Sequence, residues 1–420
     1  MSESHPAINR RGFMKTMAVG ATAYSMAAAT RARAAGANDR LSVAVLGCGN
    51  RSKGALMPGL HRYASSHNLE ITAVCDPWHS HREEAADLVK SWYDKAPRQC
   101  VSHRELLELD NIDAVIIASC DHQHALQLKD CMEAGKDAYV EKPMAMTMEE
   151  LDIAYDAVIK HNAVVQVGTQ LRSMASMAGA REVYQKGTLG RVGRIEQHRN
   201  TWRPYWYPHI KTDLTEDDVD WAEFCMPHST KTFDSVFCSA WYGYRDFSDG
   251  ALPGLGAHFF DLVHYITGAK YPESAVCLGG SYTWNDEHKF TCPDHIEALW
   301  TYPEGFLMNY CTNFGNESGN TFRFYGDEAE MDLADWGNPV LTSHGVRGKE
   351  PAVSEPTKIE HIAQPDHIQN WVECIRSREK PNADIEAGYS HSIAAIMAIM
   401  SFDQGKRMIY DPERREVRAG

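Results

Sequence analysis

Short apolar runs alternate with amphipathic stretches between residues 41 and 167, and this alternation constrains the fold more than any other feature of the chain. The apolar runs predict strands at 41–46, 70–75, 113–118, 137–140 and 164–167. The amphipathic stretches predict helices at 53–62, 79–92, 103–109, 125–133 and 148–160. Because parallel strands need long crossovers, usually helical, regular strand–helix alternation predicts a parallel, doubly wound sheet.

The pattern changes after residue 168, where strands follow one another without helices between them. Strands are predicted at 194–201, 275–284, 296–301, 306–313, 321–325 and 330–333, and helices at 255–267, 367–376 and 387–400. The aromatic-rich residues 202–250 and the polar residues 338–360 lack a clear period and predict two long loops. Successive strands without crossover helices indicate an antiparallel or mixed sheet.

The segment Gly47-Cys48-Gly49-Asn50-Arg51-Ser52 directly follows the first predicted strand. Glycines here allow a tight turn and let backbone N–H groups approach a pyrophosphate at a helix N-terminus. Asp76 ends the second strand 24 positions after Ser52, near the ~20 typical of dinucleotide sites. A carboxylate there accepts hydrogen bonds from a ribose diol and repels a 2′-phosphate. The motif therefore predicts a bound dinucleotide, with NAD favoured over NADP.

Val140-Glu141-Lys142-Pro143 follows the apolar strand at 137–140. Ligands of doubly wound sheets bind at the carboxyl ends of the strands, so Lys142 is predicted to lie beside a nicotinamide ring. An ammonium group next to a hydroxyl that is being oxidised stabilises the developing alkoxide. Partial burial near a cationic ring would lower the pKa of the lysine toward a useful range. The segment predicts oxidation of a sugar-type hydroxyl beside the dinucleotide.

We therefore expect an α/β chain with an N-terminal Rossmann domain and a C-terminal α/β domain built on an open, mostly antiparallel sheet. A length of 420 residues suits two domains. We place the Rossmann domain at 38–168 and a substrate and oligomerisation domain at 169–365. Residues 366–420 are expected to be C-terminal helices that return to the Rossmann domain.

Residues 1–34 are predicted to be a twin-arginine signal peptide. Asn9-Arg10-Arg11-Gly12-Phe13-Met14-Lys15 is a twin-arginine signature, a mild apolar run follows, and Ala32-Arg33-Ala34 offers a cleavage site. The signature resembles that of the export system that carries proteins already folded, typically with a cofactor inside. The mature protein is therefore expected in the periplasm, or otherwise exported, with its dinucleotide loaded.

The formal net charge of −15 argues against nucleic acid or an anionic membrane as a partner, because both require a basic face. No apolar run reaches the ~20 residues of a membrane span, so no membrane insertion is expected. The eleven cysteines are odd in number and form no CxxC pair. They predict mostly free, buried thiols and leave one disulfide open.

Taken together, the motifs resemble the glucose–fructose oxidoreductase / inositol dehydrogenase / rhizopine-catabolism (Gfo/Idh/MocA) family, as an exported twin-arginine-signal member. The resemblance covers most of residues 40–400. It is carried, in family order, by Gly47-Cys48-Gly49-Asn50-Arg51, Ala118-Ser119-Cys120-Asp121-His122-Gln123-His124, Glu141-Lys142-Pro143, Gly168-Thr169-Gln170 and Gly256-Ala257-His258-Phe259-Phe260-Asp261. The family implies a Rossmann domain, an α/β substrate domain, frequent homo-oligomers and hydride exchange at a sugar or polyol carbon.

The resemblance also implies residue roles. Lys142 would contact the reacting hydroxyl, and His258 would lie at the substrate and relay the hydroxyl proton, so we expect these two to be catalytic. The contacts to the dinucleotide are expected from Gly47, Gly49, Asn50, Arg51, Asp76, Ser119, Asp121, His124, Glu141, Lys142 and Gln170.

The chain departs from the family pattern four residues before His258. Many relatives carry an aspartate at that position, which is Gly254 here. Either another acid (Asp246, Asp249 or Asp261) takes its place, or the chemistry differs from simple alcohol oxidation.

The substrate is expected to contact Arg172, Asp261, Trp202, Tyr244 and Arg245. Aromatic faces stack on sugar C–H surfaces and guanidinium groups bind hydroxyls or carboxylates, although the same side chains also suit a core or a subunit interface. The aromatic-rich loop at residues 202–250 contains Trp202, Tyr205, Trp206, Tyr207, Trp221, Trp241, Tyr242 and Tyr244. No metal is expected, because His122 and His124, like His288, Cys292 and His295, lack a ligand cluster with metal spacing.

The expected function is an NAD(P)-dependent oxidoreductase that acts on a sugar or sugar-derivative hydroxyl, with a tightly bound cofactor recycled within the enzyme. An exported enzyme has no cytoplasmic pool to regenerate NAD, which favours schemes without net redox change. One alternative is a redox-neutral glycosidase that works by oxidation, elimination, hydration and reduction. Another is a non-catalytic sensor that binds sugar and NAD. The partner is a carbohydrate small molecule or glycan in each case.

Overall fold

The computed structural model describes residues 40–343 and 352–420, so the predicted signal peptide lies outside the described residues. A six-stranded parallel sheet has the order β3-β2-β1-β4-β5-β6. Its strands are β1 (Leu41–Leu46), β2 (Leu69–Cys75), β3 (Arg98–Cys100), β4 (Ala114–Ile117), β5 (Asp137–Val140) and β6 (Val165–Val167). This is the doubly wound order, in which the strand order reverses between β1 and β4 and leaves a ligand crevice there.

The crossovers are helical, as predicted. A short π-helix (Ser52–Leu56) leads into α2 (Met57–Arg62), and a 3₁₀ turn (Asp121–Gln123) leads into α5 (His124–Glu133). The other crossover helices are α3 (His79–Tyr93), α4 (His103–Leu107) and α6 (Met148–His161). The ends of α6 show how the sequence sets the limits of a helix. Thr147 and Glu150 form a capping box at its start, and Asn162 ends it in the left-handed region of backbone conformation.

The second sheet has ten strands in the order β14-β13-β12-β11-β7-β10-β9-β8-β15-β16 and is antiparallel except between β7 and β10. Its strands are β7 (Val192–Thr201), β8 (Ser274–Gly280), β9 (His295–Thr301), β10 (Leu307–Phe314), β11 (Thr321–Gly326), β12 (Glu330–Asp332), β13 (Val340–Thr342), β14 (Thr357–Lys358), β15 (Met408–Asp411) and β16 (Glu416–Ala419). The open, mostly antiparallel second sheet is therefore confirmed.

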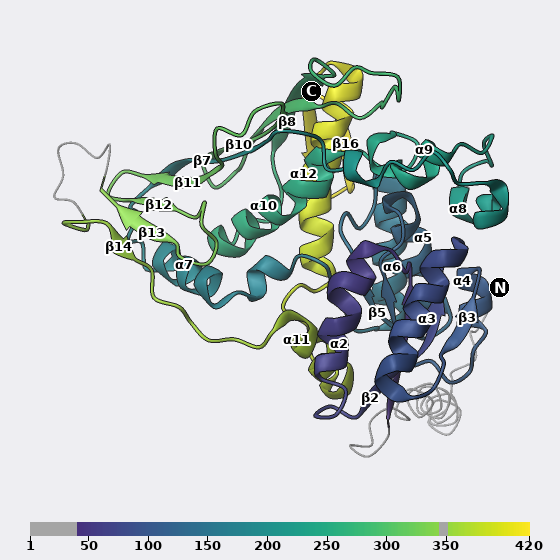
Figure 1. The fold of residues 1–420 in the computed structure, drawn as a ribbon. Coiled ribbons are helices and arrows are strands. Elements are labelled where there is room, and N and C mark those ends of the chain that lie inside the picture. The colour runs from purple at the N-terminus through teal and green to yellow at the C-terminus, as the bar shows by residue number, and fades with distance from the viewer. Residues whose placement is uncertain (1–39, 344–351) are drawn as a thin grey trace, which may run out of the picture.

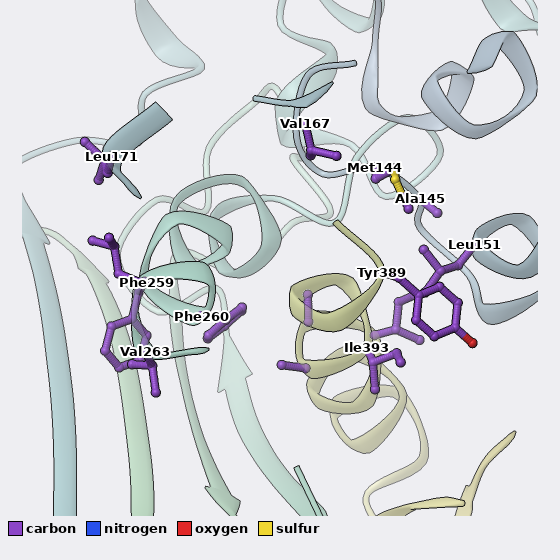
Figure 2. Packing of buried hydrophobic residues seen from close by; sticks show 14 of the residues in the cluster. Met144, Ala145, Leu151, Val167, Leu171, Phe259, Phe260, Val263, Tyr389 and Ile393 are labelled. Carbon is purple, nitrogen blue, oxygen red and sulfur yellow. The ribbon is translucent and has the colours of Figure 1, made fainter. Parts of the chain in front are cut away.

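Helices α7 (Ala175–Gln185), α10 (Ala251–Thr267) and α12 (Ile385–Gln404) lie beside this sheet (Figure 1). The buried helix α12 contacts α10 and β8 of the second sheet and also α6 and β6 of the Rossmann domain. Figure 2 shows Tyr389 of α12 near Leu151, while Phe260 of α10 lies on the other side of α12. One continuous apolar core therefore joins the two sheets.

The structure corrects several details of the expected organisation. Of the C-terminal segment 366–420, α11 (His367–Ser377) packs on the Rossmann sheet through Trp371, but β15 and β16 extend the second sheet. The expected loop at 338–360 contains β13 and β14. Helix α10 begins at Ala251 rather than Leu255, because Pro253 lies in the first turn, where no N–H is needed.

The expected loop at 202–250 is a folded segment with short helical turns, and we call it the covering segment. It contains α8 (Trp221–Cys225), α9 (Ser235–Ser239) and 3₁₀ turns at Tyr207–His209, Glu216–Asp218 and Trp241–Gly243. Figure 1 shows α8 and α9 on the side of the molecule where the Rossmann helices α4 and α5 lie. The segment therefore reaches from the second domain to the first.

Candidate functional site

The glycine turn after β1 has the backbone that a dinucleotide requires. Gly47 adopts φ +88°, and a Cβ there would lie 2.4 Å from the backbone of Ala118 and Ser119. A Cβ at Gly49 would meet no atom within 4 Å. Ser52 is buried and its hydroxyl donates to the Gly47 carbonyl. Gly47 is therefore needed by the fold, whereas the bare backbone at Gly49 faces open space.

Asp76 closes one side of this turn. Its carboxylate accepts hydrogen bonds from the Cys48 N–H at 2.6 Å and from the Trp78 N–H at 2.8 Å. Burial raises the pKa of Asp76 to about 6, despite these hydrogen bonds, which favour the ionised form. The carboxylate thus ties the end of β2 to the glycine turn at the place where a ribose diol binds in this fold.

A cavity of about 460 Å³ lies along the carboxyl ends of β1, β2 and β4. Six of the eleven predicted dinucleotide contacts line it, namely Gly47, Gly49, Asn50, Arg51, Asp76 and Ser119. The covering segment forms the opposite wall with Pro208, His209, Ile210, Lys211, Ser239, Trp241 and Tyr242. The cavity is therefore a slot between the two domains rather than an open groove.

Hydrogen bonds hold the covering segment on the Rossmann domain. The Gln123 side-chain amide donates to the carbonyl oxygens of Glu223 at 2.9 Å and Met226 at 3.0 Å. The Asp220 N–H donates to Pro77 O at 2.9 Å. The His122 N–H donates to a carbonyl of the same segment. These hydrogen bonds therefore fix the wall that the covering segment forms along the slot.

Two of the other predicted contacts, Glu141 and Gln170, meet at Arg51, which itself lines the cavity. The Arg51 Nε donates to Glu141 Oε1 at 2.6 Å, and its terminal nitrogen lies 3.4 Å from Gln170 Oε1. A Cβ at Gly168 would lie 2.6 Å from the Glu141 carboxylate. The glycine before Gln170 therefore provides the space in which Glu141 meets Arg51.

Lys142 is partly buried and its Nζ donates to the Gly254 carbonyl at 2.5 Å. Burial lowers the pKa of Lys142, although the carboxylates of Glu141 and Asp121 oppose the effect. Because α10 begins three residues before Gly254, this carbonyl belongs to the first turn of the helix that also carries His258. The predicted pair Lys142 and His258 is thus brought together from two domains.

His258 is neutral in this environment. Burial and the nearby Lys142 cation lower the pKa of His258 well below its usual value. Its Nδ1 is buried and has no hydrogen-bond partner among residues 40–343 and 352–420. A neutral imidazole with an unused ring nitrogen can exchange a proton with a substrate hydroxyl.

Asp121 and His124 build the loop after β4. The Ser248 hydroxyl of the covering segment donates to Asp121 Oδ2 at 2.6 Å. Burial raises the pKa of Asp121 to about 7, although the Lys142 cation favours ionisation. His124 is buried, with Nδ1 2.7 Å from Pro143 O and Nε2 3.1 Å from Ser119 O. His124 therefore links the two loops at the site and does not line the cavity.

Arg172 and Asp261 were predicted to bind substrate, but the structure pairs them with each other. The guanidinium makes two hydrogen bonds to the carboxylate, at 2.8 and 2.6 Å. Both side chains are buried, and Arg172 also donates to Asn382 O at 2.9 Å. His391 Nδ1 lies 3.6 Å from the same carboxylate. This pair joins α10 to the chain after β6 and engages both side chains within the protein.

The remaining predicted substrate contacts lie away from this site. Trp202 is 59% exposed and packs edge-on against Trp284. Tyr244 is buried, and its hydroxyl donates to His288 O at 2.9 Å. Arg245 pairs with Asp249 and Asp403. Geometry therefore does not group these three with Lys142 and His258.

Sequence reasoning did not single out three residues that the structure brings to the site. Tyr205 and Tyr242 come from the aromatic run of the covering segment, and Gln123 holds that segment in place. Nothing in the run itself distinguishes the two tyrosines from their neighbours. The sequence did contain a signal for Gln123, because this residue lies between His122 and His124 on a loop predicted to contact the ligand.

Among the described residues, no group of three or more His, Cys, Asp or Glu side chains is arranged to hold a metal ion. All eleven cysteines are free thiols, and ten of them are buried. Within residues 40–343 and 352–420, no helix combines the length and the apolarity that crossing a bilayer requires.

The glycine turn, the slot between the two domains and the partly buried lysine are features of a two-domain dinucleotide-binding protein. The model of the oxidoreductase family with an NAD-binding Rossmann fold matches residues 41–169, and the model of its C-terminal α/β domain matches residues 181–409. The chain therefore belongs to the Gfo/Idh/MocA oxidoreductase family.

Individual relatives agree with this assignment. The chain is 30% identical over 385 residues to glycosyl hydrolase family 109 protein 1 of Shewanella sp. (strain ANA-3), covering 84% of this chain and 81% of that protein. It is 28% identical over 149 residues to the uncharacterized oxidoreductase YrbE of Bacillus subtilis, covering 34% of this chain and 44% of that protein.

A solved structure shares the fold. Levoglucosan dehydrogenase, in complex with NADH and levoglucosan, superposes with a TM-score of 0.67 at 16% identity, covering 88% of this chain and 99% of that one.

Proposed function

We propose that the protein is an NAD-dependent enzyme that oxidises a hydroxyl of a sugar or sugar derivative and recycles its cofactor without releasing it. One observation carries the proposal. The Nζ of Lys142 is held on Gly254 O, close enough to His258 to lower the pKa of that histidine, and Glu141 next to Lys142 binds Arg51, which lines the dinucleotide slot.

The slot fits a dinucleotide by its own geometry. The backbone at Gly49 faces open space, and the Asp76 carboxylate stands at the end of β2. Gly47, Gly49, Asn50 and Ser119 would hold the pyrophosphate and ribose, and Asp76 favours NAD over NADP because it repels a 2′-phosphate. Bound NAD would accept a hydride from the substrate carbon.

The chain itself handles the proton of the hydroxyl. Because burial lowers the pKa of Lys142, the amine form is more accessible and can accept the proton as the hydride leaves the carbon. When the substrate is re-reduced, the same ammonium returns the proton, so atoms and electrons balance over the cycle. His258, whose imidazole is neutral beside Lys142, would be the next group in a relay.

Cofactor retention follows from the covering segment. It forms one wall of the slot and is held by hydrogen bonds from Gln123. Export by the twin-arginine route, proposed from Arg10 and Arg11, would carry the enzyme folded and loaded. Retention and export together favour a cycle that starts and ends with the same form of the cofactor.

A redox-neutral glycosidase is the second candidate, favoured by relatives named glycosyl hydrolase family 109, one of which matches over 97% of this chain at 25% identity. A ketone formed on the sugar ring acidifies the neighbouring C–H. Elimination of the glycosidic group, hydration and re-reduction then complete hydrolysis without net redox change.

Two measurements test the proposal. Denaturation of the purified mature protein should release NAD, identified by chromatography. The intact protein is then incubated with sugars and with aryl glycosides. Release of an aglycone without net NADH selects the glycosidase, and steady NADH formation with added NAD selects an ordinary dehydrogenase. Sugar binding without a dinucleotide or turnover would contradict both and indicate a sensor.

A further inference from the structure

The space next to Gly254 is occupied by a tyrosine from the covering segment. A Cβ built at Gly254 would lie 2.6 Å from Tyr205 Oη and 3.6 Å from Tyr205 Cζ. The carbonyl of the same residue accepts the hydrogen bond from Lys142 Nζ. The phenol oxygen therefore stands where a side chain at position 254 would begin, on the same residue whose carbonyl holds the Lys142 Nζ.

Packing fixes the position of this phenol. The Tyr205 ring makes edge-on contacts with Trp206, Tyr242 and Phe314, with centroids 5.3, 5.6 and 6.0 Å away. No hydrogen bond to its hydroxyl is seen among residues 40–343 and 352–420. A half-buried hydroxyl that packing holds in place without a protein partner calls for an explanation, and a hydrogen bond to a ligand would supply one.

The three carboxylates considered as replacements for an acid at position 254 are engaged elsewhere. Asp261 is bound by Arg172, Asp249 by Arg245, and Asp246 by Lys231. Tyr205 is thus the polar group that the structure places at this position.

We propose that Tyr205 is a further catalytic residue, whose hydroxyl donates a hydrogen bond to the substrate oxygen that loses its proton to Lys142. This proposal rests on the proposed function. Burial and the nearby Asp121 raise the pKa of Tyr205, so the phenol stays protonated and acts as a donor while Lys142 exchanges the proton. A neutral donor fixed beside the reacting oxygen stabilises the charge that develops there.

The first test substitutes Tyr205→Phe, with Tyr207→Phe as the matched control. Tyr207 lies two positions away on the same segment and its hydroxyl donates to Asp286 at 2.6 Å, outside the site. We expect Tyr205→Phe to lower kcat by about 10²-fold while the NAD content of the purified protein stays unchanged. Tyr207→Phe should leave kcat at the wild-type level.

The pH profile separates a catalytic role from a structural one. If the phenol shares the reacting oxygen with Lys142, its loss should shift the pH dependence of kcat as well as lower its maximum. A fall in kcat with an unchanged profile, or an equal fall in Tyr207→Phe, would overturn the proposal.

A second measurement reads the geometry without turnover. Gly254→Ala places a methyl against the rigid phenol and should lower the melting temperature by about 2–12 °C. In the Tyr205→Phe background the nearest atom is 3.6 Å away, so the same substitution should have little effect. Equal losses in both backgrounds would overturn the placement of Tyr205.

Failure of the proposed function can be distinguished from failure of the Tyr205 proposal. Wild-type protein without turnover on any sugar would overturn the proposed function and this proposal with it. Wild-type turnover that is undiminished in Tyr205→Phe would overturn this proposal alone.

Discussion

Gly47→Ala tests whether the glycine turn is built as described. Gly47 adopts φ +88°, in the left-handed region, which costs a residue with a Cβ about 1–2 kcal/mol. The new methyl would also lie 2.4 Å from the backbone carbonyl of Ala118 and the N–H of Ser119. Carbon contacts are comfortable near ~3.5 Å, so the end of β4 must retreat by about 1 Å, and overpacking of this kind costs about 1–3 kcal/mol.

The expected total is a loss of about 2–5 kcal/mol in the free energy of unfolding. For a domain of this size it corresponds to a fall of about 4–20 °C in melting temperature. Differential scanning calorimetry of the purified variant measures it directly.

Gly49→Ala is the matched control, two positions along the same turn. Its methyl meets no atom within 4 Å, so the melting temperature of the protein stripped of cofactor should change little. The methyl enters the slot, however, and should reduce the NAD retained through purification. If Gly47→Ala melted like the wild type, or Gly49→Ala unfolded as readily as Gly47→Ala, the assignment of the two glycines would be wrong.

Further predictions concern the lysine, the buried ion pair, the covering segment and the open sheet. Lys142→Met should lower kcat by about 10²-fold or more while bound NAD is retained, checked by chromatography of the denatured variant; wild-type turnover would contradict its role. Asp261→Asn leaves the Arg172 cation buried without its partner and should cost about 3–5 kcal/mol in urea unfolding. Although burial alone raises the pKa of Asp261, Arg172 holds it well below its usual value. The ion pair therefore stabilises the fold above pH ~4, and this stabilisation is lost as the pH falls from there toward the lowered pKa of Asp261. If the free energy of unfolding of Asp261→Asn depended on pH as in the wild type, the pairing would be refuted. Gln123→Ala removes the amide that holds the covering segment and should speed NAD dissociation about 5- to 30-fold, measured by exchange with labelled NAD; an unchanged rate would show that the segment does not gate release. We propose that the open sheet forms a subunit interface. Leu278 on β8 is 79% exposed, so Leu278→Asp should yield a monomer in sedimentation velocity, and a variant that sediments like the wild type would contradict an interface on this face.

Much of the fold was predictable because each local signal was strong. Strands such as β1 and β5 match the predicted bounds, since their apolar runs are flanked by turn residues. Short edge strands such as β14, of two residues, carry too little pattern to be recognised. The late strands β15 and β16 join the sheet through pairing with β8, which is a long-range contact that no local pattern contains.

The placement of the candidate site residues could be predicted where a backbone requirement fixed the residue type. Gly47, Gly49 and Asp76 lie as the motif implied, and Lys142 and His258 meet through α10. The pairing of Arg172 with Asp261 could not be predicted from the sequence. A charged residue predicted near a cleft has the same sequence pattern whether it binds a ligand or forms an ion pair. Tyr205 was hidden for the same reason, since only the fold distinguishes it from the other aromatic residues of the covering segment.

We propose that a retained NAD and Lys142 act together on a sugar hydroxyl. Stopped-flow mixing of the purified protein with sugars and aryl glycosides, without added NAD, follows this step through the nicotinamide absorbance. We expect a rise of at most one NADH per chain, abolished in Lys142→Met, followed by a return as the cycle closes. No rise with any sugar, or a rise that persists in Lys142→Met, would contradict it.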